Sequence, residues 1–118
     1  MNLILSSSIL SLALFLGGLT DKETDFIKEI DRIYRVAKSK SELYKLEVLV
    51  RENLKIFPKS GEIFWRLGRT YFKLGEKANS ESEKTRYFLL CMEQTEKALK
   101  KNPNLANGYF FNGLCNGS

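Results

Sequence analysis

Few residues of this chain carry side chains that could do chemistry. Its 118 residues include no histidine, which removes the commonest general base, the commonest zinc ligand and every Ser/His or Cys/His nucleophile pair. A phosphate-binding loop is also missing, because no Gly-Lys pair is followed by Ser or Thr. Neighbouring carboxylates stand where helices are expected to begin, and there they cap the helix: Asp21, Glu23 and Asp25, then Glu81 and Glu83. The sequence therefore predicts no enzyme and no catalytic, cofactor-binding or metal-binding residues.

The two cysteines, Cys91 and Cys115, have no metal-like spacing. Cys91 falls within an apolar stripe at helical spacing, which favours a small buried hydrophobic residue. A disulfide or a reactive thiol is the alternative. We expect the buried, unbonded state.

The charge of the chain is moderately positive. Nineteen Lys and Arg stand against 14 Asp and Glu, a net charge of +5, and the two signs are interspersed. No block of like charge resembles a nucleic-acid-binding tail, so we expect no nucleic-acid partner.

Residues 1–19 differ from the rest of the chain. They contain no charged side chain, and the apolar run from Ile9 to Leu16 is followed by Gly17 and Gly18 before the chain turns polar. This pattern is typical of an export signal, although it lacks a basic start and an Ala-x-Ala site. An uncleaved membrane anchor and an amphipathic terminus are the alternatives. We expect a periplasmic or secreted protein, or a membrane-anchored one, rather than a cytoplasmic protein.

Residues 20–118 are expected to be all-α. Three Ser/Thr-x-x-Glu sequences, each of which can cap the start of a helix, begin at Thr20, Ser39 and Ser80. Pro58 and Gly61 separate the second and third helices. Pro103 is expected in the first turn of a fifth helix.

The third helix has an unusual composition. Phe64, Leu67 and Tyr71 form one apolar stripe, and Trp65 and Phe72 belong to another. Two apolar faces predict an inner helix that is packed on both sides. Gly68 lies within this helix, at a cost of about 1 kcal/mol relative to alanine.

Spacing between landmarks suggests a repeat. The two prolines are 45 residues apart, and the Phe64-x-x-Leu67-Gly68 sequence six residues after Pro58 returns as Tyr109-x-x-Asn112-Gly113 six residues after Pro103. The aromatic-x-x-Leu-Gly-x-x-Tyr pattern that ends at Tyr71 resembles the tetratricopeptide repeat, a helix–turn–helix unit of about 34 residues. This copy carries an extra segment around residues 75–85. It is similar to the long repeats of the regulator-of-microtubule-dynamics proteins and of the T-component of TRAP transporters.

The resemblance implies antiparallel helix pairs stacked as a tetratricopeptide-like solenoid of about two and a half repeats. Their bounds would be about 27–60, 61–105 and an incomplete 106–118. It also implies that Gly68 marks a close approach to the next helix, around Leu90 and Cys91. The incomplete last repeat, with the three adjacent aromatics Tyr109, Phe110 and Phe111, would leave apolar surface exposed, so either the natural protein is longer or this edge pairs with another chain.

Solenoids of this kind bind peptides on the face formed by the first helix of each pair. Lys28 and Asp31 lie on that expected face. The residues that we predict to line the groove are Arg35, Lys38, Trp65, Arg69, Phe72 and Lys73. Their cations would suit an acidic or carboxylate-ended ligand.

The expected function is therefore that of a non-catalytic module that binds another protein or a peptide. Self-association through its C-terminal edge is the alternative to a longer natural protein, which we favour. In the groove hypothesis, Arg35, Arg69 and Lys73 hold the ligand while Trp65 stacks on it. A ligand-binding accessory component of a transporter is the alternative, with Trp65, Phe72 and Phe110 lining a cavity for a small organic acid.

Overall fold

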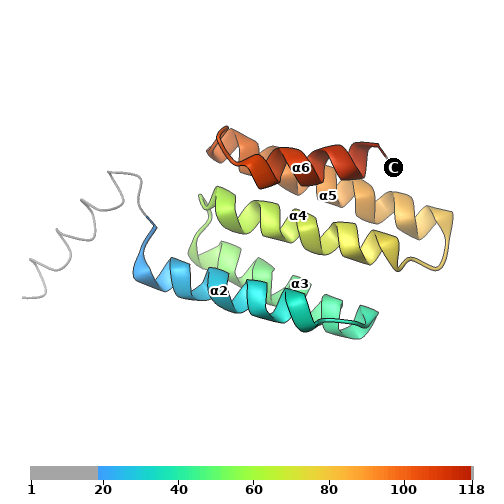
Figure 1. Cartoon of the computed structure of the whole chain (residues 1–118), viewed down its shortest axis with the longest axis horizontal. Helices are drawn as coiled ribbons and strands as arrows, with labels where there is room; N and C mark the ends of the chain where they lie inside the picture. Colours follow the sequence, from blue (N-terminus) through green and yellow to red (C-terminus); the bar gives the residue numbers. More distant parts are fainter. Residues whose placement is uncertain (1–18, 118) are drawn as a thin grey trace, which may run out of the picture.

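Five helices and no strand make up residues 19–117, the part of the chain that the computed structural model describes. They are α2 (Asp21–Val36), α3 (Lys40–Ile56), α4 (Gly61–Glu76), α5 (Glu81–Lys101) and α6 (Ala106–Asn116). Helices α2, α4 and α6 lie in one layer, and α3 and α5 lie behind them (Figure 1). The expected all-α fold of stacked antiparallel pairs is confirmed. The predicted signal or anchor at 1–19 lies outside the described residues except for Leu19.

The helices begin where the capping sequences predict. Thr20 Oγ1 accepts a hydrogen bond from the backbone N–H of Glu23 at 3.0 Å, and Ser39 and Glu42 cap each other reciprocally. The extra residues of the long repeat contribute to the 21-residue length of α5. One expectation is wrong, because Pro103 lies in the turn before α6 and not in its first turn.

Helix α4 is the inner element of the fold. It packs against each of the other four helices, as its two apolar faces predict. Its side chains Ile63, Leu67, Tyr71 and Leu74 are at most 1% exposed and form the centre of the core. Each such side chain contributes roughly 1.5–3 kcal/mol by its burial.

Gly68 marks the close contact of α4 with α5. A Cβ atom at this position would lie 2.6 Å from Thr95 Cγ2 and 3.2 Å from the carbonyl oxygen of Cys91. Only glycine leaves room for this approach, which confirms the expected role of Gly68. Gly113, its counterpart 45 residues later, has no atom within 4 Å of such a Cβ.

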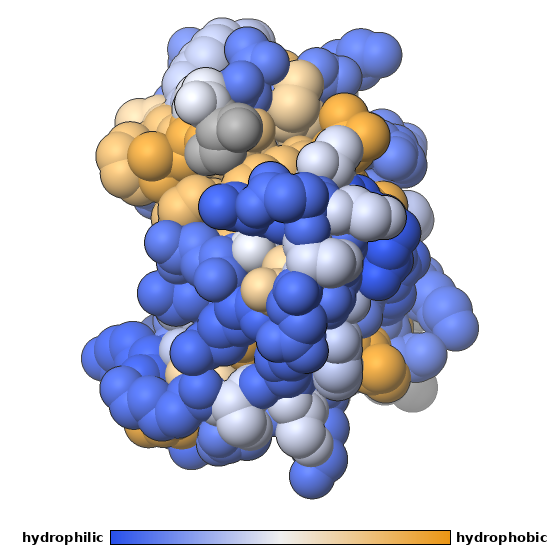
Figure 2. Space-filling view, turned by 90° about the vertical axis from the view of Figure 1, so that its right-hand side faces the viewer, coloured by the Kyte–Doolittle hydropathy of each residue, from blue (hydrophilic) through white to orange (hydrophobic). Residues whose placement is uncertain are grey.

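On the face of the molecule drawn in Figure 2, apolar residues gather at the end formed by α5 and α6, whereas the α2–α3 end of that face is mostly hydrophilic. Helices α2 and α3 also expose apolar side chains, among them Val36, Val48 and Ile56 at 53–58%. Tyr109 and Phe110 of α6 are 57% and 59% exposed, as expected, whereas the adjacent Phe111 is half-buried against Trp65. Leu89 of α5 is 59% exposed. Helix α6 carries no charged side chain.

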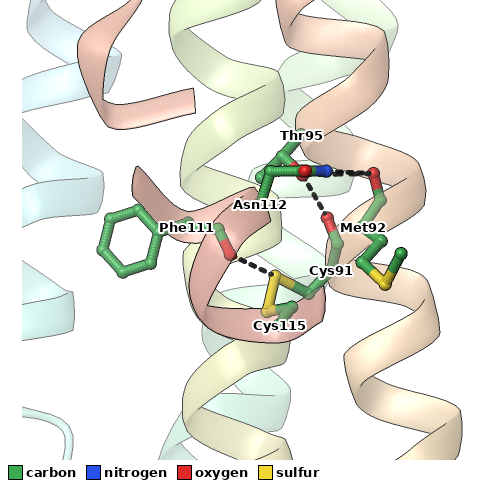
Figure 3. Close-up of a disulfide and its surroundings, with 6 residues drawn as sticks. All are labelled: Cys91, Met92, Thr95, Phe111, Asn112 and Cys115. Carbon is green, nitrogen blue, oxygen red and sulfur yellow. Dashed lines mark hydrogen bonds between the residues drawn. A yellow bond between two sulfur atoms is a disulfide. The ribbon is translucent and has the colours of Figure 1, made fainter. Parts of the chain in front are cut away.

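A disulfide between Cys91 and Cys115 joins α5 to α6 (Figure 3). The expectation that Cys91 is an unbonded hydrophobic residue is therefore wrong, although it is fully buried. The two cysteines are 24 residues apart, and the antiparallel packing of α5 and α6 brings them together. Next to the disulfide, the Asn112 amide donates to Thr95 Oγ1 at 3.0 Å, so a polar contact and a covalent bond both hold α6 in place.

Candidate functional site

Asp31 of α2 binds two arginines of α4. Arg66 donates from Nε to Asp31 Oδ1 at 2.9 Å and from Nη2 to Oδ2 at 3.1 Å, and Arg69 Nη2 donates to Oδ1 at 2.7 Å. The two arginine side chains are only 11% and 12% exposed. This fork-to-carboxylate geometry fixes the relative positions of α2 and α4.

The environment of these charges alters their titration. Partial burial would raise the pKa of Asp31, but the hydrogen bonds from Arg66 and Arg69 outweigh it and hold the pKa below its ordinary value. Burial of the Arg69 guanidinium lowers the pKa of Arg69, and Asp31 partly opposes that shift. Arg69 stays charged at neutral pH because an arginine titrates so far above it.

Arg69 also contacts aromatic rings. Its Cζ lies 3.9 Å from the ring centroid of Tyr34 and 5.1 Å from that of Trp65, within the range of cation–π attraction. Its buried Nε has no hydrogen-bond partner among residues 19–117. Arg69 is thus a fixed positive charge beneath the surface between α2 and α4.

A cleft of about 750 Å³ lies over this charge. Four cationic and three anionic side chains line it: Lys28, Arg32, Arg35, Arg69, Asp25, Glu29 and Asp31. Arg32 pairs with Glu29 at 2.6 Å, whereas Lys28 and Arg35 make no ion pair with any described residue. Two cations at the surface of the cleft are therefore free to meet a ligand.

The six residues predicted for the groove fall into two groups. Arg35 and Arg69 line the cleft. Lys38 is exposed just beyond the end of α2, and Lys73 pairs with Glu76 at 3.4 Å.

Trp65 and Phe72 have a packing role in the described structure. Trp65 is 4% exposed, its ring stacks on Phe111 at 5.9 Å between centroids, and Arg66 covers it at 4.2 Å. Phe72 stacks on Phe88 at 5.8 Å. The Trp65 ring thus has no face open to a ligand, contrary to the stacking role that the groove hypothesis gave it.

Sequence reasoning missed the part played by Arg66 and Arg32. Arg66 was not included in the expected groove, although it lies three residues before Arg69 and thus on a neighbouring part of α4. Arg32 follows Lys28 by one helical turn in the same way. The transporter-accessory alternative relied on Trp65, Phe72 and Phe110. None of these three residues lines the α2–α4 cleft.

Comparison with known proteins bears on this arrangement. The sequence model of a family described as regulator of microtubule dynamics protein 1-3 matches residues 26–118. This chain belongs to that family. The match spans all five helices except residues 21–25 of α2, so it includes both arginines that Asp31 holds and every residue of the cleft lining except Asp25. No curated protein and no solved structure matches the chain.

Two further observations apply to the family member described here. Within residues 19–117, no helix has both the length and the apolar content needed to cross a bilayer. The same residues contain no group of three or more side chains able to hold a metal ion.

Proposed function

We propose that this chain is a non-catalytic protein-binding module whose α2–α4 cleft takes an acidic segment of another protein. The observation that carries the proposal is the pair of surface cations, Lys28 and Arg35, which make no ion pair within residues 19–117 and lie beside the buried charge of Arg69. A partner carboxylate at this place would form charge-assisted hydrogen bonds. Asp31 would orient Arg69 and would not itself meet the ligand.

The proposal includes a tetratricopeptide-like repeat organisation for residues 27–60, 61–105 and 106–118. Its support is the layer formed by α2, α4 and α6 and the close approach at Gly68. In such an array the cleft between the first helices of successive pairs is the natural place for a ligand.

We also propose that the protein is exported or tethered outside the reducing cytosol. The Cys91–Cys115 disulfide supports this location, since disulfides persist mainly in oxidising compartments. The family is described as regulators of microtubule dynamics, so polymerised tubulin is one partner to be tested. A tubulin partner would place the protein in the cytosol, which is not the compartment that the disulfide supports.

A binding experiment with charge reversal tests the cleft. Lys28→Glu with Arg35→Glu should weaken binding to acidic peptides by about tenfold or more, because two attractive charges become repulsive. Lys100→Glu with Lys101→Glu, which changes the charge equally on the exposed end of α5, should leave binding within about twofold. Unchanged binding by the cleft variant would overturn the proposal.

The same purified protein distinguishes the alternatives. Co-sedimentation with microtubules that the cleft variant loses would identify a tubulin-based partner. Thermal stabilisation by small organic acids, without any protein or peptide, would instead favour a transporter accessory.

Self-association through α6 is a further part of the proposal. Tyr109 and Phe110 are exposed on a helix without charged residues, and the surface at Gly113 is open. A second copy of the same edge can approach such a surface without like-charge repulsion, so we propose a second copy as its occupant.

A further inference from the structure

A second groove lies on the side of the molecule formed by α3 and α5. Lys40, the first residue of α3, forms an ion pair of 3.0 Å with Glu83 in the first turn of α5. Further along, a groove of about 570 Å³ lies between the helices, and Phe64 and Leu67 of α4 line it from below. Its volume falls within the range of roughly 300–1,000 Å³ that is usual for ligand sites.

Gln94 is a polar residue in the lining of this groove. The residue is 6% exposed and its amide makes no hydrogen bond with residues 19–117. The amide atoms are not fully enclosed, because the fully buried side-chain atoms without a partner among those residues are Asn53 Nδ2 and Arg69 Nε. Its neighbour Thr95 makes three hydrogen bonds with described residues. The amide is therefore placed to bond a molecule that enters the groove.

The apolar lining of the groove can receive an apolar side chain. Phe64 is half-buried, and Val48 and Leu54 of α3 lie on the adjoining wall, Val48 with 58% of its surface exposed. Burial of one leucine-sized side chain there would contribute roughly 1.5–3 kcal/mol.

The rim of the groove is mainly cationic. Arg51 and Lys55 of α3 and Lys97 of α5 line it, with Glu52 as the one carboxylate in the lining. Each cation pairs with a carboxylate one turn away on its own helix, at 3.2–3.3 Å, and each side chain remains 49–74% exposed. Exposed pairs of this kind are worth about 0–1 kcal/mol, so a ligand carboxylate can compete for the cations.

We propose that this groove binds an extended peptide in which an apolar residue is flanked by acidic residues. A side-chain amide offers both a donor and an acceptor, which match the C=O and N–H of a peptide backbone. In a helical ligand those groups would already be bonded to each other, so the unpartnered Gln94 favours an extended one. This site is separate from the α2–α4 cleft and shares no lining residue with it.

A peptide-display selection on the full chain, followed by affinity measurement on the selected peptides, tests the proposal. The expected peptides carry a Leu or Phe between Asp or Glu residues. Gln94→Leu should weaken their binding by about tenfold through the loss of the backbone hydrogen bonds, with a melting temperature that is unchanged or raised. Lys97→Glu should weaken binding by roughly threefold or more.

The cleft variant Lys28→Glu with Arg35→Glu serves as the matched control and should bind these peptides as the original chain does. This control separates failure of the groove from failure of the α2–α4 cleft. The proposal is overturned if no such peptide is selected, or if Gln94→Leu and Lys97→Glu bind as well as the original chain. Selected peptides that bind as helices, by circular dichroism and regardless of Gln94, would overturn it too.

Discussion

At the scale of single residues, two glycines that lie 45 residues apart meet opposite surroundings. Gly68 faces Thr95 and the backbone of Cys91, while Gly113 faces open space. Thr95 is fully buried, with its Cγ2 methyl group in the space that Gly68 leaves. The tight crossing of α4 and α5 thus depends on a small residue on each helix.

The two glycines provide a direct test of the close crossing of α4 and α5. Gly68→Ala should lower the free energy of unfolding by about 1–3 kcal/mol, because the new methyl group forces α4 and α5 apart. Gly113→Ala should raise it by about 0.5–1 kcal/mol, because alanine favours the helix and meets nothing. Urea denaturation of both variants measures the difference, and equal effects of the two changes would contradict the close contact at Gly68.

The bridge at Asp31 has a predicted pH dependence. The pKa of Asp31 is lowered on folding, so its ionised carboxylate stabilises the fold above its unfolded pKa, near 3.8, and this contribution is lost as the pH falls through the folded pKa. Asp31→Asn should cost about 2 kcal/mol at pH 7, a value reduced for the partial exposure of Asp31, and much less at pH 2.

Urea denaturation at a series of pH values checks this prediction. Asp25→Asn is the control, because Asp25 lines the same cleft and makes no ion pair with a described residue. The prediction fails if both variants lose the same stability, or if the loss for Asp31→Asn persists unchanged at pH 2.

At the scale of helices, the starts of α2, α3 and α5 could be predicted because Thr20, Ser39 and Ser80 cap their own helices through local contacts. The approach of α4 to α5 could be predicted because a glycine inside a helix lowers the stability of the helix, a cost that close packing against another helix can offset. The ion pairs of Asp31 could not, since they join residues 35 and 38 positions apart and depend on the rotation of α2 relative to α4. Trp65 shows the same limit, because its burial requires Phe111 from a helix that follows much later.

The disulfide could not be predicted either. It depends on the alignment of α5 with α6, which the spacing of the two cysteines in the sequence does not reveal. Once α5 and α6 pack antiparallel, Cys91 and Cys115 face each other, and the bond closes a loop of about 25 residues. Restricting the unfolded chain in this way is worth about 3.5 kcal/mol at 25 °C.

Reduction should therefore lower the free energy of unfolding by about 3 kcal/mol and loosen α6 first. Hydrogen exchange with and without a reductant measures both effects, and the amides of residues 106–116 should lose protection before those of α4. The Cys91→Ala, Cys115→Ala double variant should exchange at the same rate in both conditions. Unchanged protection of α6 after complete reduction would show that packing alone holds it.

At the scale of the whole molecule, three surfaces differ in their charge. The α2–α4 cleft carries free cations, the α3–α5 groove has a cationic rim, and α6 presents aromatic side chains without any charge. These surfaces belong to different helices, so one copy of the chain can bind partners through α2–α5 while α6 pairs with a second copy.

Sedimentation equilibrium over roughly 10–500 μM, a range suited to a weak edge contact, tests that pairing. The original chain should form dimers, and Phe110→Glu should keep it monomeric, because a carboxylate cannot be buried at the uncharged edge without a partner. Val36→Glu is a closely matched control, since Val36 is 56% exposed but lies on α2. A chain that stays monomeric at every concentration, or a Phe110→Glu variant that associates as the original does, would mean that α6 is not the dimer contact. Retention of peptide binding by the monomeric variant would then show that the two binding surfaces work without the dimer.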